Sequence, residues 1–117
     1  MKESPIFVKM YDYTKWLLDH TIKFTKSQRF VMARRIEEVV LNFYDLLLLA
    51  VKEDKDKPNI LNKASFELER VKHYVRLSKD LNLFSLKQYE YSSKEIVEKG
   101  KLLGDWIKKN SPVKCMG

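Results

Sequence analysis

The sequence is poor in the residues that form turns, disulfides and metal sites. Its 117 residues include three glycines, three prolines, one cysteine and two histidines. So few turn-forming residues predict long helices with few connections. A single cysteine, Cys115, excludes an internal disulfide and every motif of paired cysteines, and it indicates an inert thiol in a reducing environment such as the cytoplasm.

Long hydrophobic runs are also missing. The first residues, MKESPIFVKMYDYTKW, lack the apolar core and the small-residue cleavage site of a signal peptide. The most apolar stretch, 39–51, has thirteen residues, whereas a helix that crosses a bilayer needs about 20. We therefore expect a cytoplasmic protein with no membrane partner, folded as one domain over residues 1–117.

Apolar residues recur in steps of three and four along most of the chain, which predicts helices. No segment alternates with a period of two over a useful length, so we expect an all-α fold, an antiparallel up-down-up-down four-helix bundle. The four series that predict its buried faces are Phe7, Met10, Thr14, Leu17, Thr21 and Phe24; Ala33, Ile36, Val40, Phe43, Leu47 and Ala50; Leu61, Ala64, Leu68, Val71, Val75 and Ser78; and Leu86, Tyr89, Ser93, Ile96, Gly100, Leu103 and Ile107.

Capping residues predict where these helices begin and end. The charged loop 53–59, which contains Pro58, separates the second and third helices, and segment 110–112 ends the fourth. The expected N-terminal caps are Ser4 with Pro5 behind it, Ser27 and Ser85.

The second helix is too apolar for a single bundle. Only Asn42 and Asp45 between residues 39 and 51 are neither apolar nor aromatic, and a helix that is apolar on most sides must be covered on more than one of them. Either a second copy of the chain covers the extra face or the helix lies deep at the bundle centre. Gly100 and Gly104 add a related choice: they form a strip for close approach of another backbone, or they make room for a tryptophan within the subunit.

No catalytic or metal-binding motif is present. The nearest approach to a di-iron site is Glu69 with His73, which are four residues apart instead of three and have no second copy, so we expect a helix-surface pair. The other histidine, His20, has no HExxH context, and the sequence contains no GxxxxGK[ST] loop, nucleophile elbow or CxxC. We expect a protein that is not an enzyme, with no catalytic residue, cofactor or metal.

The chain is basic, with a net charge of +7 that is spread over its whole length. Such a folded domain favours polyanion partners, and rows of cations at helical spacing bind phosphates without reading sequence. The alternative is a set of solvated faces that keep the protein soluble. The candidate nucleic-acid-binding residues are Lys72, Arg76 and Lys79 in the third helix, and Lys26, Arg29, Arg34 and Arg35 at the start of the second.

Three stretches resemble the accessory variability determinant (Avd) family of diversity-generating retroelements. They are YDYTKWLLDHTIKFTKSQRFVMARRIE, RVKHYVRLSKDLNLFSLKQYEYSSKEI and GKLLGDWIKK, in the order and with the spacing typical of that family. The chain departs from the family at Thr25, where proline is usual, and at Asp105, where a small residue is common. A more distant similarity connects it to proteins encoded in intervening sequences of 23S rRNA genes.

The Avd resemblance implies a basic, non-catalytic four-helix bundle that assembles as a homopentameric barrel. Its implied partners are reverse transcriptase, RNA and DNA, and its implied role is to support mutagenic cDNA synthesis. Within the turn, Phe24 and Phe30 are expected to pin the chain to the bundle, and Lys26 and Arg29 to join the cationic surface. The alternative is a structural or interaction protein of the 23S rRNA intervening-sequence type, without a reverse transcriptase partner.

Overall fold

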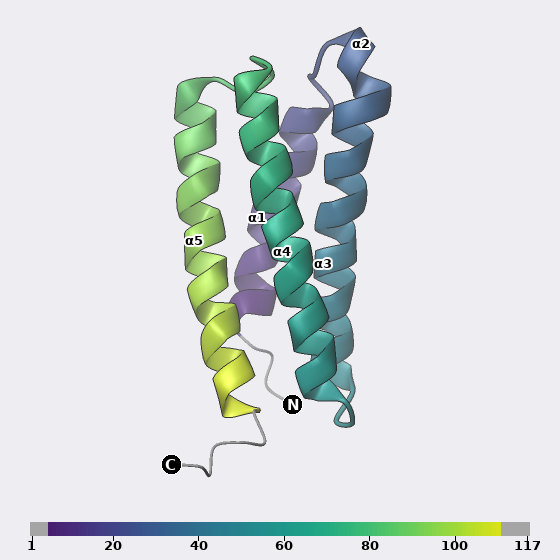
Figure 1. Ribbon diagram of the computed structural model, residues 1–117, viewed down its shortest axis with the longest axis vertical. Coiled ribbons are helices and arrows are strands. Elements are labelled where there is room, and N and C mark those ends of the chain that lie inside the picture. Colours follow the sequence, from purple (N-terminus) through teal and green to yellow (C-terminus); the bar gives the residue numbers. More distant parts are fainter. Residues whose placement is uncertain (1–4, 111–117) are drawn as a thin grey trace.

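The computed structural model describes residues 5–110, and all regular structure in that range is helical (Figure 1). The predicted all-α class is confirmed. The expected cap Ser4, segment 111–112 and Cys115 lie outside the described residues. The elements are α1 (Pro5–Thr21), α2 (Lys26–Gln28), the π-helical turn η1 (Arg29–Ala33), α3 (Arg34–Lys52), α4 (Lys57–Asp80) and α5 (Leu86–Lys109).

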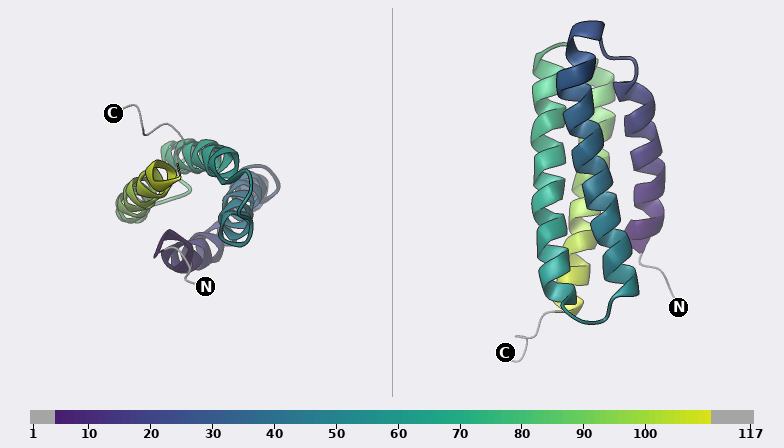
Figure 2. Two further views of the ribbon diagram at one scale, coloured as in Figure 1. Left: turned by 90° about the horizontal axis from the view of Figure 1, so that it is seen from below. Right: turned by 90° about the vertical axis from the view of Figure 1, so that its right-hand side faces the viewer.

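The four long helices form the predicted up-down-up-down bundle. α1 and α4 run in one direction, while α3 and α5 run in the other (Figure 1). Seen along the bundle axis, the order around the ring is α1, α3, α4 and α5, so helices that are consecutive in sequence are neighbours in space (Figure 2). The short α2 and η1 lie at the end of the bundle where α1 and α4 end, and they lead directly into α3.

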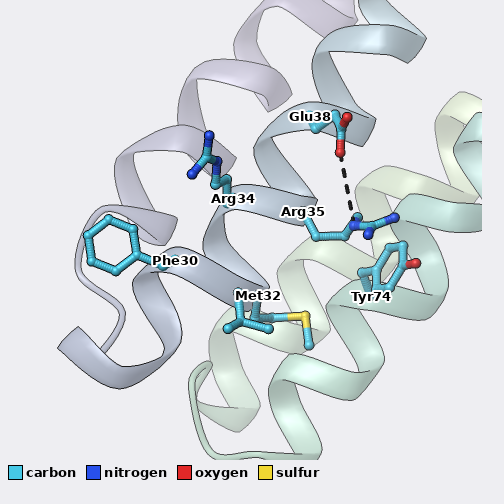
Figure 3. A pocket seen from close by; sticks show the side chains of 7 residues that line it. Phe30, Met32, Arg34, Arg35, Glu38 and Tyr74 are labelled. Atoms are coloured by element: carbon cyan, nitrogen blue, oxygen red, sulfur yellow. Dashed lines mark ion pairs between the residues drawn. The ribbon is translucent and has the colours of Figure 1, made fainter.

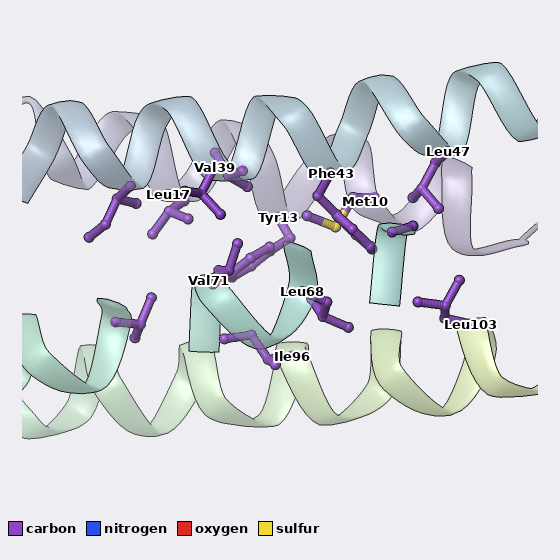
Figure 4. Close-up of a cluster of buried hydrophobic side chains, with 14 of the residues drawn as sticks. Met10, Tyr13, Leu17, Val39, Phe43, Leu47, Leu68, Val71, Ile96 and Leu103 are labelled. Carbon is purple, nitrogen blue, oxygen red and sulfur yellow. The ribbon is translucent and has the colours of Figure 1, made fainter. Parts of the chain in front are cut away.

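The core contains side chains from all four long helices (Figure 4). Every residue of the second and third predicted series is buried, and so is the first series apart from the partly exposed Phe7. Ile6 and Tyr13 are fully buried although neither belongs to a predicted series. Each large apolar side chain buried in this way contributes about 1.5–3 kcal/mol to folding.

The predicted buried face of α5 is wrong over part of its length. Ile96 and Leu103 are buried as expected, but Leu86 is 62% exposed and Gly100 faces solvent. The positions one residue earlier than Ser93 and Gly100 face the core instead, namely Ser92 and Lys99. Both are polar, and both have polar partners: Ser92 pairs with the buried Tyr13, and Lys99 with Glu95 and Glu98 of its own helix, so apolar periodicity does not reveal them.

Two helix ends follow the sequence signals. α5 begins with a capping box, in which the Ser85 hydroxyl accepts a hydrogen bond from the Gln88 backbone N–H and the Gln88 side chain accepts one from the Ser85 N–H. α4 ends at Asp80 in a Schellman motif, with Asn82 in the left-handed region at φ 62° and Leu83 N–H donating to the Ser78 carbonyl. Both features fix the direction in which the chain enters α5.

The predicted cap Ser27 is wrong. Thr25 occupies the N-cap position of α2, with extended backbone angles of φ −59° and ψ 154°, and no side chain caps this helix. Ser27 lies inside the first turn, where its hydroxyl is 3.3 Å from that of Thr25. The chain therefore turns two residues earlier than the sequence indicated.

Candidate nucleic-acid interface

The two phenylalanines of the turn between α1 and α3 differ in burial. Phe24 is 3% exposed and meets the Phe84 ring edge-on, with 5.2 Å between the ring centroids. Phe30, by contrast, is 70% exposed. Met32 and Ala33 take the buried positions of η1, which leaves the Phe30 ring on the outside. Phe24 thus pins the turn as predicted, whereas the same prediction for Phe30 is wrong.

A hollow of about 500 Å³ lies beside Phe30, and we call it the η1 hollow (Figure 3). Phe30 and Arg34 lie together on one side, while Arg35, Glu38 and Tyr74 lie on the other. The remaining residues that line it are Val31 and Met32. The hollow therefore combines two aromatic rings and two guanidinium groups, contributed by three consecutive parts of the fold, η1, α3 and α4.

The two arginines of this hollow differ in how strongly they are engaged. The Arg35 guanidinium carbon lies 5.9 Å from the centre of the Tyr74 ring, and its Nε is 4.0 Å from Glu38 Oε1. Within residues 5–110, Arg34 forms no ion pair. Its positive charge is exposed and available to an anion.

The predicted cationic row on α4 is Lys72, Arg76 and Lys79. Lys72 and Arg76 are exposed and form no ion pair with any described residue. Lys79 is partly engaged, because its Nζ is 3.6 Å from Asp80 Oδ1 and 5.3 Å from the centre of the Tyr89 ring. Lys72 borders a hollow of about 190 Å³ between α4 and α5.

The structure does not merge the predicted cations into one patch. The α4 row faces α5, since Lys72 shares a hollow with Tyr89 and Lys79 lies over the same ring. Arg35 instead lies over Tyr74, on the side of α4 that faces α3. The remaining candidates Lys26, Arg29 and Arg34 are exposed on α2, η1 and the start of α3.

A polar seam between α1 and α5 was not expected from the sequence. Lys99 is only 1% exposed, and its Nζ donates hydrogen bonds to Glu95 at 2.6 Å and Glu98 at 3.1 Å. Glu98 also accepts one from Lys9 of α1 at 2.7 Å. The spacing of Glu95 and Lys99, four residues apart, is the signal that predicts such a pair.

Burial and pairing shift the pKa values of this seam. Burial alone lowers the pKa of Lys99, but the hydrogen bonds to Glu95 and Glu98 more than offset it and leave this pKa raised. The pKa of Glu98 is lowered by the hydrogen bonds that it accepts from Lys9 and Lys99. Burial raises the pKa of Tyr13 well above its ordinary value. At neutral pH Lys99 and Glu98 are thus charged and Tyr13 is neutral, and the Lys9–Glu98 pair joins α1 to α5.

The two glycines of α5 and the His73–Glu69 pair lie on the surface of the bundle. A Cβ at Gly100 would be 3.9 Å from the nearest atom, of Leu68, and one at Gly104 would meet nothing within 4 Å, so packing inside the subunit requires neither glycine. His73 Nε2 lies 3.7 Å from Glu69 Oε1 on an exposed face, which confirms the surface pair. No three His, Cys, Asp or Glu side chains among residues 5–110 are placed to hold a metal ion.

The second predicted helix, α3, has apolar residues outside its buried face, and three of them are leucines. Leu41, Leu48 and Leu49 of α3 are all exposed, so deep burial at the bundle centre does not account for them. Even so, no described helix is both long and apolar enough to span a membrane.

The bAvd-like family model matches residues 6–110, which is nearly the whole described chain. The chain belongs to the bAvd-like family. Membership implies an Avd-like accessory role in diversity-generating retroelements at the level of the family, whose members are generally non-catalytic. No curated protein matches the sequence.

The fold also matches a solved structure. It is the crystal structure of a protein with unknown function from the S23 ribosomal protein family of Bacteroides thetaiotaomicron, with a TM-score of 0.82 and 21% sequence identity. The match covers 92% of this chain and 99% of the other. At this identity the similarity establishes that the two chains share a fold, and nothing about activity.

Proposed function

We propose that this chain is a basic accessory subunit of a diversity-generating retroelement. It assembles into a closed ring of identical subunits, binds the reverse transcriptase and the template RNA or cDNA, and so supports mutagenic cDNA synthesis. The observation that carries the proposal is the family match over residues 6–110, combined with rows of exposed cations on a rigid helical frame.

The α4 row supports nucleic-acid binding. Lys72 and Arg76 project from a regular helix, and in the described part of the chain no carboxylate pairs with either. Each phosphate contact releases counterions and contributes affinity that depends on salt instead of sequence. A ring repeats the row in each subunit, so a single strand engages several weak sites together and the overall affinity exceeds that of one subunit.

Exposed leucines support assembly. Leu41 and Leu48 lie one heptad apart on α3, and Leu49 adjoins them. Each of these leucines is 40–45% exposed, so covering the remainder gains about 1 kcal/mol per side chain. In a ring with cyclic symmetry every subunit covers the same face of its neighbour.

The test measures binding of a fluorescent single-stranded RNA over a range of salt concentrations. For Lys72→Ala/Arg76→Ala/Lys79→Ala we expect weaker binding and a plot of log affinity against log salt whose slope is smaller by at least about 2, since each engaged row loses three cations. The matched control, Lys94→Ala/Lys101→Ala/Lys108→Ala, removes the same charge from an exposed row on α5. Equal losses in both variants would show that net charge, and not the α4 row, drives binding.

A second candidate is a structural or interaction protein without a reverse transcriptase partner, as in the 23S rRNA intervening-sequence proteins. The observation that favours it is the close match in fold to an S23 family structure. The two candidates differ in gene neighbourhood. A reverse transcriptase gene and a repeated template beside this gene support the first candidate, and their absence supports the second.

A further inference from the structure

We infer that the η1 hollow holds an unpaired nucleobase of single-stranded RNA or DNA, stacked on Phe30, with the adjoining phosphate bound by Arg34. This inference rests on the proposed nucleic-acid binding and assigns it a second site, separate from the α4 row. It also predicts a preference for single strands over duplexes, which a row of cations alone does not provide.

The Phe30 ring is exposed to solvent. A phenylalanine buries 150 Å² or more in a protein core, yet this ring is 70% exposed, and the adjacent Val31 is exposed as well. η1 itself is a π-helical turn, a form that is rare, usually a single turn long, and frequent at functional sites. The backbone thus adopts an uncommon conformation that leaves an aromatic face open to solvent.

Arg34 lies where it can bind the phosphate of a nucleotide whose base stacks on Phe30. It follows Phe30 by four residues, and the two side chains lie on the same side of the hollow (Figure 3). A nucleotide has the matching arrangement, because a flat apolar base is attached through its sugar to an anionic phosphate. Base–aromatic stacking accepts any base, and the guanidinium binds a phosphate through charge-assisted hydrogen bonds.

The charge around the hollow distinguishes a nucleotide from a second copy of the chain. Arg34 is unpaired within residues 5–110, and the exposed Arg29 and Lys26 lie on the same turn. A phosphate strand neutralises these cations, whereas the apolar face of a second copy would cover them without a counter-charge. A duplex offers phosphates but keeps its bases stacked inside, so a single strand fits the ring and the arginine together.

Phe66 is also an exposed phenylalanine, but the arginine beside it is already paired with a carboxylate. It is 63% exposed on α4, and the Arg70 guanidinium lies 5.9 Å from its ring centre. Arg70, however, donates to both carboxylate oxygens of Glu67, at 3.2 and 3.3 Å. Its charge is already satisfied, so Phe66 provides a matched control of nearly equal exposure.

The experiment compares two labelled single strands of about 16 nucleotides, an oligothymidylate and a strand of the same length that is abasic at every position. The abasic strand keeps its phosphates and loses the bases. On oligothymidylate we expect Phe30→Ala to weaken binding at least about fivefold, Phe30→Trp to retain it and Phe66→Ala to leave it unchanged. On the abasic strand we expect Phe30→Ala to bind as the parent does.

Several results would overturn this inference. One is an unchanged affinity of Phe30→Ala for oligothymidylate, and another is an equal loss on both strands. A third is a lower oligomer mass for Phe30→Ala with strand binding intact, which would show that the ring packs against another copy. If the parent protein binds neither strand at low salt, the proposed nucleic-acid binding fails as well, so the two failures are distinguishable.

Discussion

The Tyr13 hydroxyl of α1 lies 2.7 Å from the Ser92 hydroxyl of α5, and both side chains are buried. The two residues are 79 positions apart in sequence, so this hydrogen bond joins the first long helix to the last. Beside it, the Lys99 ammonium lies 6.0 Å from the centre of the Tyr13 ring. Together these contacts set the rotation of α5, because they place polar residues of that helix toward α1.

Removing the Tyr13 hydroxyl should destabilise the fold. For Tyr13→Phe we expect the free energy of unfolding to fall by about 1–3 kcal/mol, since the Ser92 hydroxyl stays buried and loses its partner. Ser92→Ala, added to Tyr13→Phe, should recover part of the loss, because neither hydroxyl is then left unsatisfied. Urea unfolding of the parent, both single variants and the double variant measures the coupling. Strictly additive losses would mean that the two hydroxyls do not interact.

Stability should also decline in alkali. The folded-state pKa values of Tyr13, Tyr91 and Lys99 are all raised, from ordinary values of 10.0 for the tyrosines and 10.5 for lysine. A raised folded pKa gives stability that is complete below the unfolded pKa and is lost as the pH rises above it. We therefore expect a constant melting temperature between about pH 7 and about pH 10 and a decrease beyond it. The decrease should be shallower in Tyr13→Phe. An equal decrease in the parent and in Tyr13→Phe would show that Tyr13 does not cause it.

Ser85 caps α5 and Ser27 caps no helix, so alanine variants of these two serines can be compared. Ser85→Ala removes the hydroxyl of the α5 capping box and should cost about 1 kcal/mol of unfolding free energy. Ser27→Ala should change stability by less than about 0.5 kcal/mol, because Ser27 caps no helix and is exposed. Thermal unfolding followed by circular dichroism distinguishes the two. A larger loss of unfolding free energy for Ser27→Ala than for Ser85→Ala would show that Ser27 does cap a helix.

Assembly should depend on the exposed leucines of α3. Light scattering coupled to size exclusion should give the parent a mass of about five times the 14.0 kDa chain. Leu41→Glu/Leu48→Glu should reduce that mass toward 14.0 kDa with helicity unchanged, because charges then lie on the covered face. Leu86→Glu is the control, since Leu86 is exposed in the first turn of α5, where an acidic residue is favourable. A monomeric parent at micromolar concentration would refute the ring.

The sequence predicts the bundle well where apolar residues alone define the buried face. This holds for α3 and α4, where every residue of the predicted series is buried, from Ala33 to Ala50 and from Leu61 to Ser78. It fails for α5, because Ser92 and Lys99 are buried by virtue of partners on α1 and on the preceding turn. The pairing of Ser92 with Tyr13 exists only once the helices are assembled, whereas the spacing of Glu95 and Lys99 is a signal in the sequence that apolar periodicity passes over.

The candidate site was only partly predictable for a similar reason. The spacing of Lys72, Arg76 and Lys79 places them on one stripe of a helix, and the structure agrees. The η1 hollow was not predictable, because no signal in the sequence marks the π-helical turn Arg29–Ala33, in which Phe30 is exposed. Tyr74, from α4, completes the hollow only through the packing of α4 against α3.

Reverse transcription from the template RNA of a diversity-generating retroelement, taken from the genome that encodes this chain, most directly tests the accessory role. The measurement is the yield of cDNA made by the reverse transcriptase of that element, with and without the full chain. We expect the chain to raise the yield and Lys72→Ala/Arg76→Ala/Lys79→Ala to raise it less, since fewer phosphates are then bound. An equal cDNA yield with and without the chain would contradict the proposed function.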